Sequence, residues 1–149
     1  MRAPIVTACA ALTLSACNGT PDEPRVIVED AVVTLPAVPG RPGAAYFELR
    51  ANRTPTNLVS LTSPLVRKIE LHESRTRNGK SSMQPLDNTA FPGNGVMEFK
   101  PGGKHAMLTG IDKSVKEGSK IPITFTFDPA PAVTVEAEVR GPGGSHEGA

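Results

Sequence analysis

Residues 66–73 run Val-Arg-Lys-Ile-Glu-Leu-His-Glu, a stretch in which apolar and polar side chains alternate. Successive side chains of a β-strand point to opposite faces, so this period of two predicts a half-buried strand. Ile69 and Leu71 share the apolar face, and Glu70 and His72 share the polar one. We therefore expect His72 to lie outside the core.

A second stretch, residues 104–109, has the same alternation and reads Lys-His-Ala-Met-Leu-Thr. Ala106 and Leu108 share one face, while His105 and Met107 share the other. The imidazole and the thioether of this His-x-Met pair therefore lie side by side on one strand face. A Lys-Pro-Gly-Gly turn directly precedes the pair, so we expect it near the end of the sheet, accessible to solvent and to a partner.

The remaining sequence is also typical of β-structure, because 15 Pro and 14 Gly interrupt short runs of Val, Ile, Thr and Phe. A chain of 149 residues is long enough for one ordinary domain with a real core. The pattern predicts an all-β sandwich or barrel. The expected strands are residues 25–34, 44–50, 57–61, 66–73, 81–86, 96–100, 104–109, 121–127 and 133–140.

The N-terminal segment has the features of a secretory signal: Arg2, an apolar run to Leu14, and a small-residue end. The run is too short to be a permanent membrane anchor. Its ending, Leu-Ser-Ala-Cys17, resembles a bacterial lipobox, which implies removal of residues 1–16 and lipid attachment to Cys17. The alternative is an ordinary signal peptide that leaves Cys17 as a free thiol.

This organisation predicts a lipidated Cys and flexible tether over residues 17–24, one β-domain over 25–140 and a flexible tail over 141–149. The mature protein would be tethered in the cell envelope or periplasm. A formal net charge of +1 argues against nucleic acid as a partner, because such binding needs clustered cations.

Both cysteines, Cys9 and Cys17, precede the predicted domain. The domain therefore has no thiol for a disulfide, a thiolate zinc site, a nucleophile or a blue-copper centre. We also find no Gly-x-Ser-x-Gly, phosphate loop or His-Glu-x-x-His motif. The sequence does not predict an enzyme.

The most informative set is His72, Met83, His105 and Met107, separated by ten, twenty-one and one residues. Thioether sulfur with imidazole suits the soft cuprous ion and is an unusual combination for zinc. Thioethers also need no deprotonation and form no disulfides, which suits an oxidising envelope. The set predicts a Cu(I) site.

Each donor also has an ordinary explanation when it is taken alone. His72 could be a solvated surface residue, His105 could cap a turn, and Met83 could have no binding role. Met97 shares a strand face with Phe99 and is expected in the core. His146 in the tail is either an auxiliary divalent-copper donor or a residue without a role.

The spacing of these donors resembles the copper-binding motif of the periplasmic copper chaperones of PCuAC type. The similarity covers residues 28–139 and includes Ile69-Glu-Leu-His-Glu73, Lys100-Pro-Gly-Gly103, Leu108-Thr-Gly110 and Lys116-Glu-Gly118. Members of that family often have Met directly after the first His, where this chain has Glu73.

The resemblance implies a cupredoxin-like Greek-key β-sandwich in which His72, Met83, His105 and Met107 bind Cu(I). It also implies delivery of copper to the CuA centre of cytochrome c oxidase, often alongside a Sco-like thiol protein. Two alternatives stay open: a metal-free β-sandwich lipoprotein that binds another envelope protein or has a structural role, and a protein of copper storage or detoxification.

Overall fold

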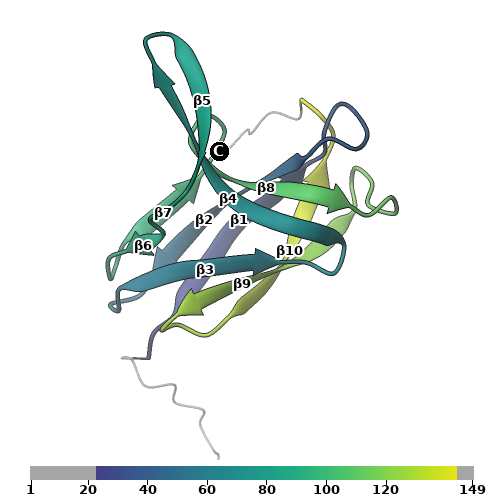
Figure 1. Ribbon diagram of the computed structural model, residues 1–149. Coiled ribbons are helices and arrows are strands. Elements are labelled where there is room, and N and C mark those ends of the chain that lie inside the picture. Colours follow the sequence, from purple (N-terminus) through teal and green to yellow (C-terminus); the bar gives the residue numbers. More distant parts are fainter. Residues whose placement is uncertain (1–22, 144–149) are drawn as a thin grey trace, which may run out of the picture.

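Ten β-strands and no helix make up residues 23–143, the part of the chain that the computed structural model describes (Figure 1). This confirms the all-β prediction. The described residues accordingly contain no helix long and apolar enough to cross a membrane. The strands are β1 (Val26–Thr34), β2 (Gly43–Ala51), β3 (Thr56–Thr62), β4 (Val66–Arg77), β5 (Lys80–Pro85), β6 (Ala90–Phe91), β7 (Val96–Phe99), β8 (Lys104–Ile111), β9 (Lys120–Asp128) and β10 (Val133–Arg140).

The predicted signal segment, Cys17 and His146 lie outside the described residues, as does most of the predicted tether and tail.

Two strand predictions were wrong. The strand that begins at Val66 continues to Arg77 instead of ending at Glu73. Its last residues are all polar, so they show no alternation of apolar and polar side chains. They are held as a strand by pairing with β5 across a two-residue turn. The second error is β6, which was not predicted because two residues are too few for any period to be seen.

The turn between β4 and β5 has its own sequence cause. Asn78 and Gly79 both have positive φ, 51° and 73°, and Arg77 pairs with Lys80 across the turn. Two consecutive residues of positive φ are the hallmark of the type I′ turn, for which Asn-Gly is strongly preferred. This turn closes the β4–β5 hairpin, which extends past the rest of the sheet and projects from the body of the molecule (Figure 1).

The strands form one continuous sheet in the order β5-β4-β8-β2-β1-β10-β9-β3-β6, with β7 pairing on β2. The pair of β1 and β10 is parallel, and the other pairs in the described residues are antiparallel. The sheet curls so that β3 lies beside β4, and a bridge joins Ser63 to Val66 (Figure 1). One face of the curled sheet thus encloses the core, and the other faces outward.

The core follows from alternation along the long strands. In β9, Ile121, Ile123, Phe125 and Phe127 point inward and are buried. Burying an apolar side chain of this size stabilises the fold by about 1.5–3 kcal/mol. Aromatic rings pack across the core: Phe47 stacks on Phe99 at 4.3 Å between centroids and meets Phe125 edge-on at 4.8 Å. Met97 is 8% exposed, which confirms its predicted place in the core.

Candidate metal centre

Strand register brings the four predicted donors to one face of the sheet. His72 of β4 lies directly opposite His105 of β8, and Met107 follows two residues later on β8. Met83 of β5 lies opposite Ser74, which is two residues after His72 on β4. Residues directly opposite in an antiparallel pair share a face, as do residues two apart in one strand. The four side chains therefore project from neighbouring strands on the outer face.

The other face of β8 belongs to the core, as the alternation predicted. Ala106 and Leu108 are both 0% exposed and pack within the apolar cluster. The donors on β8 are thus mounted on a strand whose opposite side is anchored by packing. This arrangement gives the donor face a rigid support.

The two histidines are close neighbours. Their ring centroids are 6.1 Å apart, and the ring planes are inclined by 34°. His105 is 7% exposed, so the expectation of an open, solvent-accessible position for this residue was wrong. β8 lies inside the sheet between β4 and β2, and the walls of a surface pocket, including Met83, surround the ring.

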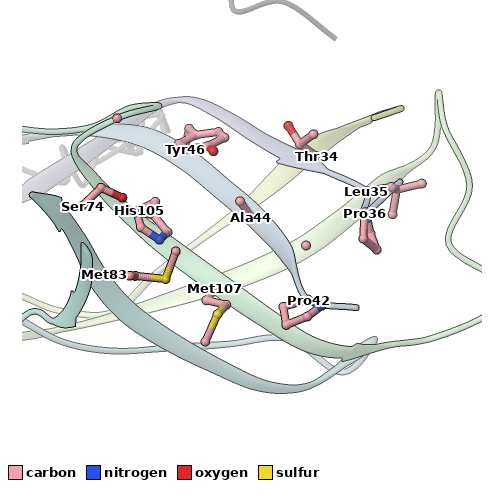
Figure 2. Close-up of a pocket in the computed structure, with 12 residues that line it drawn as sticks. Thr34, Leu35, Pro36, Pro42, Ala44, Tyr46, Ser74, Met83, His105 and Met107 are labelled. Atoms are coloured by element: carbon pink, nitrogen blue, oxygen red, sulfur yellow. The ribbon is translucent and has the colours of Figure 1, made fainter. Parts of the chain in front are cut away.

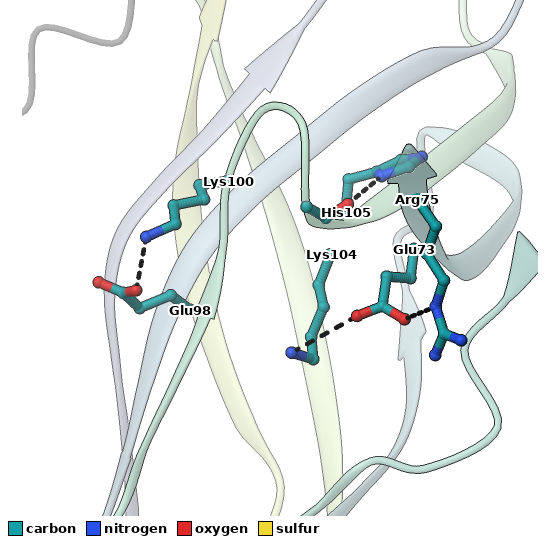
Figure 3. Close-up of polar contacts among 7 residues, drawn as sticks. Glu73, Arg75, Glu98, Lys100, Lys104 and His105 are labelled. Carbon is teal, nitrogen blue, oxygen red and sulfur yellow. Dashed lines mark hydrogen bonds and ion pairs between the residues drawn. The ribbon is translucent and has the colours of Figure 1, made fainter. Parts of the chain in front are cut away.

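Hydrogen bonding orients the His105 ring. Its Nδ1 lies 3.0 Å from the carbonyl oxygen of Gly103, to which the Nδ1–H donates (Figure 3). In a neutral imidazole this bond leaves Nε2 unprotonated, with its lone pair available. Metal-binding histidines commonly use one ring nitrogen for a backbone carbonyl and the other for the metal.

His72 provides a different observation. Its Nδ1 is buried, and no hydrogen-bond partner for it exists among the described residues. A buried polar atom without a partner is unusual in folded proteins, because its lost hydration is not replaced. A metal ion coordinated by the ring, or a small rotation of it toward such an ion, would remove this deficit.

The two thioethers meet His105 at a surface pocket of about 440 Å³. Figure 2 shows the Met83 side chain directed from β5 toward the His105 ring, with Met107 beside them. Met83 is 55% exposed and is the most open of these three donors. His72 does not line this pocket. It lies beside His105 on the neighbouring strand β4. The lining is Thr34, Leu35, Pro36, Pro42, Gly43, Ala44, Tyr46, Ser74, Met83, Gly102, His105 and Met107.

Several of these lining residues were not found from the sequence. Tyr46 is the chain's one tyrosine, and burial raises the pKa of its hydroxyl, which stays protonated at neutral pH. Tyr46 and Ala44 are two residues apart on β2, so both side chains lie on its outer face, and Ala44 lies opposite Met107. Only the pairing of β2 with β8 shows that Tyr46 borders the donors.

Glu73 points to the other face of β4 from His72. Its carboxylate lies 2.8 Å from Nε of Arg75 and 3.9 Å from Nζ of Lys104 (Figure 3). The hydrogen bond from Arg75 and the charges of Arg75 and Lys104 lower the pKa of Glu73. No group of three or more His, Cys, Asp or Glu suited to a metal occurs in residues 23–143. A site at the two histidines therefore needs the thioethers to complete it.

Comparison with known proteins identifies the family. A family model described as "Putative lipoprotein LpqE-like" matches residues 26–139. The chain belongs to the LpqE-like family. The LpqE-like chain is also 28% identical to "Putative lipoprotein Lxx21020" of Leifsonia xyli subsp. xyli (strain CTCB07) over 144 residues, which are 95% of this chain and 86% of that protein.

Solved structures resemble the LpqE-like fold closely. The "Copper-bound PCuAC domain from PmoF2" aligns with a TM-score of 0.65 at 22% identity, over 78% of this chain and 93% of that one. The solution structure of "CuI-DR1885 from Deinococcus Radiodurans" aligns with a TM-score of 0.60 at 25% identity, over 76% of each chain. These matches confirm the predicted PCuAC resemblance and the cupredoxin-like β-fold. The ligand assignment within the LpqE-like chain stays a prediction.

Proposed function

We propose that this protein is an extracytoplasmic carrier of Cu(I), which it binds through His72, Met83, His105 and Met107. The observation that carries the proposal is the placement of these side chains on one face of three adjacent strands. The unpartnered His72 Nδ1 and the oriented His105 ring add two nitrogens suited to a metal.

The donor set favours the cuprous ion on chemical grounds. Two imidazoles and two thioethers are neutral ligands, and thioether sulfur binds soft ions in preference to Mg²⁺, Ca²⁺ or Zn²⁺. Glu70, which lies opposite Met107 on the donor face, is paired with Lys68. Glu73 is engaged by Arg75 and Lys104 on the other face. With four neutral ligands, the Cu(I) site would carry a net charge of +1. Binding would also require no ligand to lose a proton.

Release would proceed by ligand exchange. Met83 lies on an edge strand and is largely exposed, whereas His105 is buried and fixed by its hydrogen bond. We expect an incoming donor of a partner to displace the Met83 sulfur first, while the histidines still hold the ion. Copper would then pass between proteins without becoming free in solution.

The cellular setting is part of the proposal. Lipid attachment at Cys17 would hold the carrier at the cell envelope, in agreement with the lipoprotein descriptions of its family and of its Leifsonia relative. Copper is present in the PmoF2 domain and Cu(I) in the Deinococcus protein. We propose delivery toward the CuA centre of cytochrome c oxidase, directly or through a Sco-like protein.

X-ray absorption on the protein reconstituted with Cu(I) under reductant tests the site. We expect one equivalent of copper, with a shell of mixed nitrogen and thioether sulfur that loses sulfur in Met83→Leu and Met107→Leu. Failure to retain copper would instead favour the metal-free envelope protein. Delivery is distinguished from storage by oxidase activity in a deletion strain, which falls only if the protein delivers copper.

A further inference from the structure

The β4–β5 hairpin has two chemically different faces. Arg77 lies opposite Lys80, and Glu73 lies opposite both Gln84 of β5 and Lys104 of β8. Alternation therefore places four cations on the face that does not carry Met83. We call this the basic face, and it consists of Arg75, Arg77, Lys80 and Lys104.

Most of the positive charge on the basic face is not neutralised. Glu73 is shared by Arg75 and Lys104, and no acidic residue occurs between positions 74 and 85. Neither Arg77 nor Lys80 forms an ion pair with another residue in the range 23–143. A near-neutral chain thus concentrates cations on one projecting element.

The pairing of Arg77 with Lys80 is unfavourable for the isolated protein. Like charges directly opposite in an antiparallel pair destabilise it. An acidic side chain at either position would have strengthened the hairpin beside its turn. The repulsion is relieved if an anionic surface binds across both residues.

The basic face is also open to a partner. Among the described strands, β5 is at an end of the sheet and pairs with β4 alone, and all six of its residues are exposed. At the base of the face is a hollow of about 330 Å³ whose lining includes Arg75, Gln84, Asp87 and Lys104. Met83 lies on the other face of β5, so a protein bound to the basic face is separated from it only by the edge of that strand.

We propose that the basic face binds an acidic surface of the copper-accepting protein. The inference deepens the proposed carrier role and rests on it for the transfer step, but docking itself requires no copper. A protein fits better than the carrier's own membrane, because the start of β1, which follows the tether, lies on the opposite side of the molecule from the hairpin tip (Figure 1). Acceptor thiolates would add further negative charge near the same cations.

Lys80→Glu tests the proposal, with Lys113→Glu as a control of equal charge change. Lys113 lies beyond the far end of β8, in the turn after Ile111. The probe is an oligoglutamate peptide titrated into ¹⁵N-labelled, copper-free protein at low salt. We expect amide shifts confined to β4, β5 and Lys104, and binding about tenfold weaker in Lys80→Glu but little changed in Lys113→Glu.

Two further readouts separate docking from other effects. Lys80→Glu should raise the Tm of the protein, because Arg77 then faces a carboxylate, and should leave Cu(I) affinity unchanged. Weakening by both variants to the same extent, or shifts spread over the whole surface, would overturn the proposal. So would binding to phosphatidylglycerol vesicles that Lys80→Glu abolishes while peptide binding persists. If the wild-type protein retains no copper, the carrier function fails independently of this result.

Discussion

At the scale of single residues, burial and hydrogen bonding divide the roles of the donors. His105 is enclosed and held by Gly103, while Met83 is open on an edge strand. Met107 lies between these extremes, half-buried on the strand that also carries His105. Such a gradient suits the proposed carrier role, because a site of uniformly buried donors would release its ion slowly.

Met107→Leu is expected to keep the fold and to weaken Cu(I) binding by about tenfold or more, a size typical of changes around a metal. The side chain faces outward, so the substitution removes a sulfur without disturbing the core. Competition with a chromogenic Cu(I) chelator measures the affinity. Met97→Leu is the matched control: it lies in the core, should cost less than about 1.5 kcal/mol of stability, and should leave the affinity unchanged.

The His105 tautomer is a second prediction at this scale. The bond to the Gly103 carbonyl requires a proton on Nδ1, so the copper-free protein should contain the Nδ1–H form with Nε2 unprotonated. Long-range ¹H–¹⁵N correlation of the imidazole ring distinguishes the two tautomers. An Nε2–H form would contradict the proposed orientation of the ligand.

At the scale of secondary structure, the β4–β5 hairpin is the element that adds Met83 to the two histidines in the proposed four-donor site. Its register sets Met83 beside the histidines, and its turn sets the register. The same hairpin carries the basic face on its other side. One supersecondary unit thus holds both the proposed exchangeable ligand and the proposed docking charge.

Gly79→Ala should loosen this unit. Gly79 has φ of +73°, and no atom of residues 23–143 lies near the position of an added Cβ, so the expected effect is backbone strain, about 1–2 kcal/mol. We expect faster amide hydrogen exchange in β5 and a severalfold loss of Cu(I) affinity, without global unfolding. Gly118→Ala is the control, because its φ is +82° and the added Cβ is equally unobstructed, but it lies in the loop between β8 and β9. Equal loss of affinity in both variants would argue against the hairpin's role.

At the scale of the whole molecule, the core and the proposed site occupy opposite faces of the same strands. β8 presents Ala106 and Leu108 to the core, and it presents His105 and Met107 to the site. Cations also gather on the hairpin, whereas the carboxylates that line up across β1, β2 and β7 are neutralised: Glu29 and Glu48 pair with Arg50, and Glu98 pairs with Lys100. The formal charge of +1 does not reveal this local excess of cations on the hairpin.

Leu108→Ala tests the separation of the two faces. The side chain is fully buried, so its truncation should lower the free energy of unfolding by about 2–5 kcal/mol. The Cu(I) affinity of the folded fraction should not change, since the truncated side chain lies on the core face of β8 and the proposed ligands lie on the opposite face. Denaturant unfolding and chelator competition measure the two quantities. A parallel fall in both would show that the faces are coupled.

Much of the fold was predictable because its signal is local. Alternation in residues 66–73 and 104–109 correctly assigned Leu108 and Ala106 to the core, and His72, His105 and Met107 to the opposite face. Turn residues marked most strand ends. The polar end of β4 and the two-residue β6 escaped prediction, because neither contains enough alternation to be recognised.

The sequence by itself determined the residue types, their spacing and the face on which His72, His105 and Met107 lie, since a period of two along one strand fixes the face locally. The tertiary structure alone decided the register that sets His72 opposite His105 and Met83 opposite Ser74. It also decided the burial of His105, the approach of Tyr46 and the joining of the cations into one face. Those features depend on which strands become neighbours, and pairing between segments distant in sequence depends on core packing and turn geometry that no single stretch contains.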